Sequence, residues 1–82
     1  MKNLVLMTTA GCHLCEVAEG IIVSTLVEGC VVEAQDIAHS DALIEQYGTS
    51  IPVVVCERSG QALGWPFDAQ QLAAFVAQLP ES

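Results

Sequence analysis

Two cysteines in the segment Met7–Glu16 are the residues of this chain best suited to chemistry. Cys12 and Cys15 stand three residues apart, separated by His13 and Leu14. At this spacing two thiols can close a small disulfide ring, can bind a soft metal ion as thiolates, or can be a purely structural pair. The residue types alone leave all three interpretations open.

The elements expected around the pair favour thiol chemistry. Residues 3–8 are apolar without alternation, which predicts a strand covered on both faces, and apolar residues recur at helical spacing over residues 14–28. Cys12 is therefore expected near a helix N-terminus, where free backbone N–H groups and the helix dipole favour a thiolate over a thiol. Cys15 follows one turn later on the same face. We interpret Cys12 as the attacking thiolate and Cys15 as the resolving thiol.

Composition narrows the class of protein. The chain of 82 residues has 2 basic and 10 acidic residues, a formal charge of −8 and 52% hydrophobic residues. So few cations argue against nucleic acid as a partner, since phosphate binding needs clustered positive charge. No apolar run approaches membrane length, and the apolar start is too short for a signal peptide. We expect a single domain over residues 1–82, cytoplasmic, monomeric and without a membrane partner.

The rest of the chain predicts an α/β domain. Gly29 suits the position after the first helix, and residues 30–37 read as a second strand parallel to the first. A short helix with an N-cap among residues 39–41 should end at Gly48. Strands follow on either side of a turn at residues 58–60, the second of them over residues 61–65. The last helix should be capped by Asp68, with Gln71 three residues later and Pro80 as its stop.

The expected order of elements is β-α-β-α-β-β-α, with the Cys-x-x-Cys at a helix start and Ile51-Pro52 before the third strand. With these features the chain resembles the thioredoxin superfamily, specifically a small glutaredoxin-like protein. The resemblance covers nearly the whole chain. It implies a four-stranded mixed sheet with helices on both faces. It also implies that Pro52 is cis and lies beside the cysteines, and that the backbone of Ile51 pairs with a substrate chain. The implied activity is thiol–disulfide exchange through a mixed disulfide, on a disulfide-containing protein or a small thiol.

The chain departs from the glutaredoxin pattern around the cysteines. Thr8 and Thr9 stand where glutaredoxins carry a lysine shortly before the first cysteine, and the whole chain contains only Lys2 and Arg58 as cations. In glutaredoxins, that lysine and other cations hold the carboxylates of glutathione. We therefore expect no cofactor, and glutathione, the one candidate, lacks its cationic site.

Four further side chains allow two interpretations each. His13 could stabilise the Cys12 thiolate as a cation or could simply face solvent. Trp65 belongs to the cluster Trp65-Pro66-Phe67, which is either a packed corner or one wall of the substrate groove. Cys30 and Cys56 lie in predicted strands among apolar residues, so we expect core positions rather than reactive ones.

Other functions compete with exchange. A soft-metal carrier could use the same Cys-x-x-Cys, and Met7-Thr8 before it has a distant parallel in ferredoxin-like metal-transfer domains. Those domains, however, have the order β-α-β-β-α-β and end on a strand. A glutathione-assisted iron–sulfur site at Cys12 would need the missing cations. A non-catalytic module could instead keep the fold and bind a peptide at Pro52.

Overall fold

The computed structural model describes residues 2–25 and 30–79, in which strands and helices follow the order β-α-β-α-β-β-α. A single 3-10 turn, η1, adjoins the second strand. The elements are β1 (Lys2–Thr8), α1 (His13–Thr25), β2 (Cys30–Asp36), η1 (Ile37–His39), α2 (Asp41–Tyr47), β3 (Val53–Cys56), β4 (Ala62–Gly64) and α3 (Ala69–Ala77).

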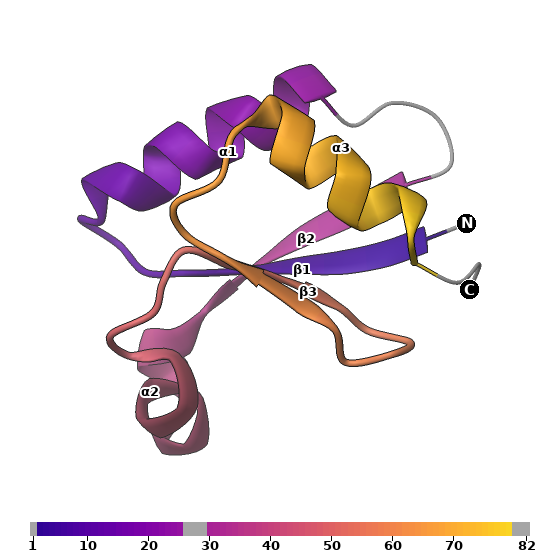
Figure 1. The fold of residues 1–82 in the computed structure, drawn as a ribbon. Helices are drawn as coiled ribbons and strands as arrows, with labels where there is room; N and C mark the ends of the chain where they lie inside the picture. The colour runs from indigo at the N-terminus through magenta and orange to yellow at the C-terminus, as the bar shows by residue number, and fades with distance from the viewer. Residues whose placement is uncertain (1, 26–29, 80–82) are drawn as a thin grey trace.

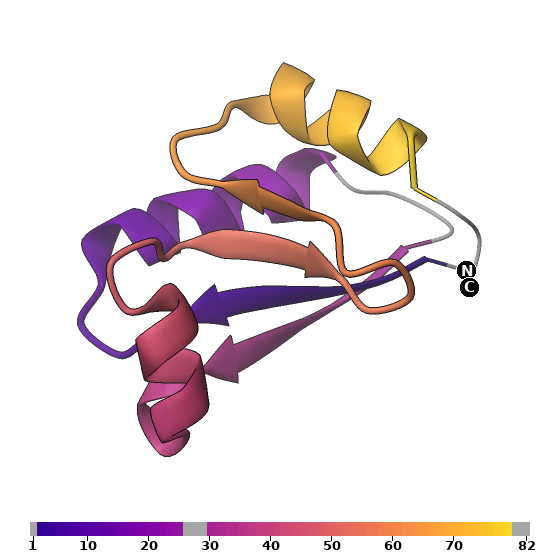
Figure 2. The same cartoon turned by 60° about the horizontal axis from the view of Figure 1, so that its bottom comes forward.

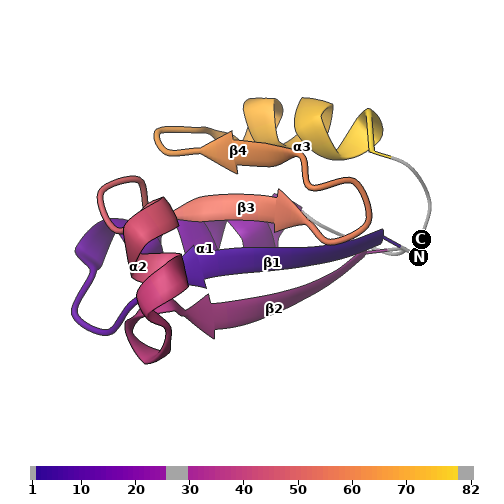
Figure 3. The same ribbon diagram turned by 90° about the horizontal axis from the view of Figure 1, so that it is seen from below.

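The strands form one mixed sheet in the order β2-β1-β3-β4 (Figure 3). β1 and β2 are parallel along their whole length, from Lys2 opposite Cys30 to Thr8 opposite Asp36. β3 runs antiparallel to both β1 and β4, and its first residue, Val53, lies opposite Met7. The fold class predicted from the sequence is thus confirmed.

Helices cover both faces of this sheet. α1 and α3 lie side by side on one face and α2 lies on the other, near the end where β1 finishes (Figures 1 and 2). A large cluster of buried apolar side chains fills the α1/α3 side: Leu4, Leu6, Ala18, Ile22, Val54, Cys56, Phe67, Leu72 and Leu79. A smaller one lies on the α2 side: Met7, Ile37 and Val53.

Strand β1 contributes to both clusters. Leu4 and Leu6 point to the α1/α3 side, while Met7 points to the α2 side with half-buried Val5 packed beside it. Successive side chains of a strand face opposite ways, so a strand covered on both faces must be apolar throughout. This explains the unbroken apolar run at the start of the chain.

Side-chain oxygens cap the start of α2 and of α3. Ser40 is the N-cap of α2, and its hydroxyl accepts a hydrogen bond from the Leu43 N–H at 3.3 Å. Asp68 and Gln71 form a reciprocal capping box at the start of α3: the Asp68 carboxylate accepts from the Gln71 N–H at 2.7 Å, and the Gln71 side chain accepts from the Asp68 N–H at 2.9 Å. The predicted role of Asp68 is confirmed.

Several predicted boundaries need correction. β2 ends at Asp36 because Ile37 begins the 3-10 turn, and the Asp36 side chain caps this turn by accepting a hydrogen bond from the Ala38 N–H. β4 is shorter than the predicted 61–65, since pairing with β3 covers only Ala62–Gly64. The predicted continuation of the first helix to residue 28, with Gly29 after it, and the stop at Pro80 lie outside the described residues. None of the helices in the described part of the chain is long and apolar enough to cross a membrane.

The buried stripe of α1 is narrower than its sequence suggests. Cys15, Ala18 and Ile22 are its buried residues, whereas Leu14 and Val17, expected on the same stripe, are 46% and 41% exposed. At about 100° per residue, the three buried positions share an arc of about 60°, and Val17 lies about 100° from the nearest of them. A single helix packed on a sheet buries only the side that faces the strands.

Candidate functional site

The tight connection between β1 and α1 carries Cys12 to the end of the sheet. After Thr8 the chain turns through Gly11, whose φ of +79° lies in the left-handed region that glycine adopts freely. The N–H of Cys12 then donates to the Thr9 carbonyl at 3.4 Å. Cys12 is thereby held where the strand has ended and the helix begins.

Cys12 occupies the N-cap position of α1. Its carbonyl accepts the first bond of the helix, from the Glu16 N–H at 3.3 Å, and its sulfur accepts a hydrogen bond from the Cys15 N–H at 3.2 Å. This is how a serine or aspartate side chain caps a helix, with sulfur in place of oxygen. A negative charge on this sulfur would face a backbone donor and the positive end of the helix dipole.

Cys12 and Cys15 are joined by a disulfide, with their Cα atoms 5.2 Å apart. Their surroundings differ: Cys12 is half-buried, while Cys15 is only 3% exposed and faces the sheet. An incoming molecule can therefore reach the sulfur of Cys12 more readily than that of Cys15. The pair can exist as a disulfide or as two thiols whose accessibilities differ.

Pro52 lies at the same end of the sheet as Cys12. It directly precedes Val53, which is opposite Met7, while Cys12 follows the end of β1. Pro52 is fully buried, and the Ile51–Pro52 peptide bond is cis, as is the Trp65–Pro66 bond. Register, rather than sequence proximity, brings the two segments to one edge (Figure 3).

Ile51, to which the resemblance gives a role in pairing with substrate, is half-buried, and its N–H already donates to the Tyr47 carbonyl at 3.2 Å. That bond belongs to the turn that ends α2. A chain laid against this segment could use the Ile51 carbonyl as an acceptor, but not the N–H while the turn is intact.

Trp65 joins this edge through its backbone. Its N–H donates to the Pro52 carbonyl at 3.1 Å, and its ring meets Phe67 edge-on with centroids 5.1 Å apart. Phe67 is buried in the main core, and Trp65 is half-buried against it. This packing agrees with the interpretation of Trp65-Pro66-Phe67 as a packed corner, and part of the Trp65 side chain stays exposed.

His13 lies on the solvent side of the site. Its ring Nδ1 is 3.9 Å from the Glu16 carboxylate, and the two side chains are 85% and 80% exposed. When protonated, the imidazole therefore has an acidic partner of its own at the start of the helix. Glu16, four residues after Cys12, is one turn along the helix, and its negative charge opposes a thiolate on Cys12.

The other two cysteines are free and distant from the pair. Cys56 is fully buried, as expected for the core, whereas Cys30 is only half-buried, at the start of the edge strand β2. Hydrogen bonding to the Ser59 side chain lowers the pKa of Cys56, although burial acts in the opposite direction. Both lie toward the beginning of β1, since Cys30 is opposite Lys2 and Cys56 is opposite Leu4.

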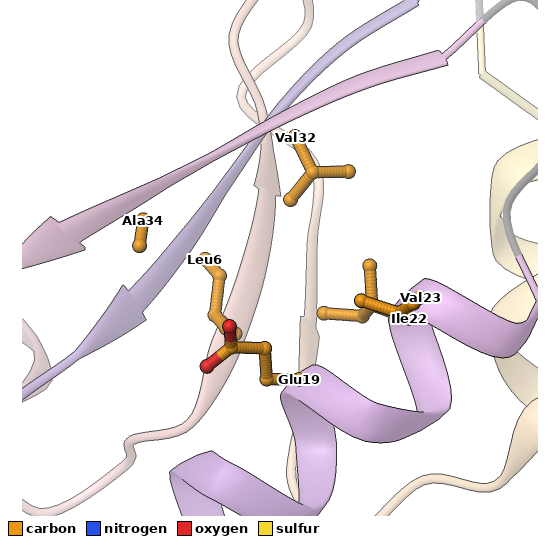
Figure 4. A pocket seen from close by; sticks show the side chains of 6 residues that line it. All are labelled: Leu6, Glu19, Ile22, Val23, Val32 and Ala34. Atoms are coloured by element: carbon orange, nitrogen blue, oxygen red, sulfur yellow. The ribbon is translucent and has the colours of Figure 1, made fainter.

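A small hollow opens between α1 and the strands β1 and β2 (Figure 4). Its volume is about 120 Å³, and Glu19 is the charged residue of its lining, which otherwise consists of Leu6, Ile22, Val23, Val32 and Ala34. Neither cysteine of the pair lines it. In residues 2–25 and 30–79, no three His, Cys, Asp or Glu side chains come together as a metal site would require.

Comparisons with known proteins agree on one kind of domain. The model of the family described as Glutaredoxin-like domain (DUF836) matches residues 3–77. The X-ray structure of the structural genomics target protein XcR50 from X. campestris is 31% identical, with a TM-score of 0.83 over 94% of this chain and 99% of that one. The solution structure of the same target is also 31% identical, with a TM-score of 0.75 over the full length of both chains. No curated protein matches the chain.

Proposed function

The chain belongs to the glutaredoxin-like domain family, and from that premise we propose that it is a thiol–disulfide oxidoreductase working through Cys12 and Cys15. One observation carries the proposal. The half-buried sulfur of Cys12 caps helix α1 and accepts a hydrogen bond from the N–H of Cys15, while Cys15, its disulfide partner, is buried one turn further on. An accessible, stabilised thiolate beside a shielded second thiol is the arrangement that exchange requires.

In the proposed reaction, the Cys12 thiolate attacks one sulfur of a substrate disulfide. A Cys12–substrate disulfide forms, and the other half of the substrate leaves as a thiolate. Cys15 then gives up its proton to solvent, attacks the Cys12 sulfur and displaces the second half. The substrate has gained two electrons, and the protein has lost two as its thiols become the Cys12–Cys15 disulfide. A cellular thiol reductant must restore the dithiol.

The edge around Pro52 supports binding of an extended chain next to Cys12. The Ile51 carbonyl is the acceptor that such a chain could use, because the N–H of Ile51 is held by Tyr47. Trp65, whose N–H is bonded to the Pro52 carbonyl, is half-buried and is a candidate apolar contact for such a chain. His13 is assigned no step, since it pairs with Glu16. We place the reaction in the cytoplasm, where free thiols such as Cys30 and Cys56 persist.

The first test is the redox equilibrium of the pair. The purified protein is equilibrated in a graded thiol–disulfide buffer, trapped by alkylation and mapped by mass spectrometry. We expect one two-electron transition, assigned to Cys12 and Cys15, whose midpoint gives the potential. A pair that never closes, or that is protected by bound metal, would reject the proposal and favour a metal carrier or a peptide-binding module.

A trapping variant tests the separate roles. Cys15→Ser should accumulate a one-to-one mixed disulfide at Cys12, because nothing remains to resolve it, whereas Cys12→Ser should form none. Cys30→Ser is the matched control, since it makes the same chemical change at a half-buried cysteine away from the pair. It should behave like the unchanged protein and accumulate no mixed disulfide at Cys12. A mixed disulfide at Cys15 in the Cys12→Ser protein would contradict the assigned order of attack.

A further inference from the structure

The lysine and arginine side chains of this molecule lie at one end of β1. Both cations of the chain, Lys2 and Arg58, lie at the end away from the cysteine pair. Lys2 begins β1, and its ammonium group donates to the Val76 carbonyl at 2.7 Å. Arg58 lies in the turn between β3 and β4, just after Cys56, which is opposite Leu4 (Figure 3). No lysine or arginine is therefore left for the end that carries Cys12.

Carboxylates, in contrast, arrive at the Cys12 end from three different elements. Glu16 is in the first turn of α1, and its own N–H is bonded to the Cys12 carbonyl. Asp36 ends β2 opposite Thr8, the last residue of β1. Asp68 begins α3, three residues after Trp65, whose N–H is bonded to the Pro52 carbonyl. The carboxylates near the candidate site thus have no lysine or arginine beside them.

Each of the two histidines of the chain lies beside one of these carboxylates. His13 is 3.9 Å from Glu16, and His39 is 3.8 Å from Asp36. Each imidazole can offset one carboxylate only when it carries a proton, and histidine is ordinarily neutral above pH 7.

On the basis of the proposed function, we propose that this site selects disulfides flanked by positive charge, and that Glu16 is a specificity-determining residue. The reaction brings the substrate sulfur to Cys12, so charges on the substrate must come within several ångströms of the Glu16 carboxylate. A cationic substrate is attracted during encounter and an anionic one is repelled. The substrate class is then a disulfide in a basic peptide segment, and glutathione disulfide, which carries several carboxylates, is a poor fit.

A charge series of small disulfides tests this selection. The reduced protein is mixed with cystamine, bis(2-hydroxyethyl) disulfide or 3,3′-dithiodipropionate at pH 8, which are dicationic, neutral and dianionic. Formation of the Cys12–Cys15 disulfide is followed by alkylation and mass spectrometry. Each rate is divided by the rate at which 2-mercaptoethanol reduces the same compound, because leaving thiols differ in intrinsic reactivity.

We expect the normalised rate for cystamine to exceed that for the dianion by about tenfold at low ionic strength, since steering by surface charge changes on-rates by at least that factor. The ratio should collapse toward one in about 1 M salt, where the screening length is about 3 Å. Glu16→Gln should lower the low-salt ratio by about threefold. Its matched control is Glu57→Gln, the same change in the β3–β4 turn at the far end, which should leave the ratio unaltered.

The outcomes distinguish failure of the charge selection from failure of the proposed thiol–disulfide exchange. Equal normalised rates for all three compounds, or a ratio that Glu16→Gln does not move, would overturn the selection while leaving the exchange activity standing. Failure to oxidise Cys12 and Cys15 with any of the three would reject the proposed function itself. A higher normalised rate for the dianion than for cystamine would likewise overturn the selection.

Discussion

The backbone N–H of Cys15 donates a hydrogen bond to the sulfur of Cys12 at 3.2 Å, so the side chain that is proposed to attack substrates is also the N-cap of helix α1. The same geometry thus serves stability and reactivity. A substitution at Cys12 should therefore change both the stability of the fold and the reactivity of the site, and the two effects must be measured separately.

This relationship predicts a difference between two variants that both lack the thiol. Cys12→Ser retains an acceptor for the Cys15 N–H, whereas Cys12→Ala leaves that donor uncapped. We expect Cys12→Ala to be less stable than Cys12→Ser by about 1 kcal/mol, the usual contribution of an N-cap. Urea denaturation under reducing conditions measures the difference without any contribution from the disulfide. Equal stabilities would show that the side chain does not cap the helix in solution.

A second prediction concerns His13, whose ring faces solvent and pairs with Glu16. Because solvent screens an exposed charge strongly, His13→Ala should change the alkylation rate of Cys12 by less than about twofold between pH 6 and 9. The reduced protein is treated with iodoacetamide across this range, and the modified peptide is quantified. His39→Ala, a change at the other exposed histidine, is the control. If the alkylation curve of His13→Ala moves to clearly higher pH, the imidazole takes part in holding the thiolate.

The capping box of α3 supplies a third prediction. Asp68→Ala removes the acceptor of the Gln71 N–H and should lower the free energy of unfolding by about 1 kcal/mol, whereas Asp68→Asn keeps a side-chain oxygen and should cost much less. Chemical denaturation of the two variants gives the comparison. An equal loss in both would mean that the carboxylate charge, rather than the hydrogen bond, stabilises this end of the helix.

Burial predicts a large contrast between two apolar residues on neighbouring helices. Leu72 of α3 is fully buried in the main core, while Val23 of α1 is 75% exposed. Leu72→Ala should destabilise the fold by about 2–5 kcal/mol, enough to unfold much of so small a domain. Val23→Ala should change the free energy of unfolding by less than about 0.5 kcal/mol. Thermal melts followed by circular dichroism measure both, and a comparable loss at Val23 would indicate that its side chain is covered in solution.

Local sequence patterns determined a good part of this fold. The apolar run that becomes β1, the helical spacing after Leu14, the N-cap at Asp68 and the turn before β4 each depend on residues close together in the chain. Such short-range signals predicted the order of elements correctly and placed Cys12 at the start of a helix. The buried position of Cys56 also followed from its apolar neighbours.

The tertiary structure decided how segments that are distant in the sequence lie relative to one another. The register of β3 against β1 puts Pro52 at the end of the sheet where Cys12 emerges, and β4 carries Trp65 to the same edge. Packing on the sheet buries Cys15 but leaves Leu14 in solvent, although both lie in the same apolar segment. No local pattern encodes these outcomes, because strand register and helix orientation are set by packing the whole core at once. The sequence by itself thus determined which residues could do chemistry, and only the assembled sheet decided which groups and charges surround them.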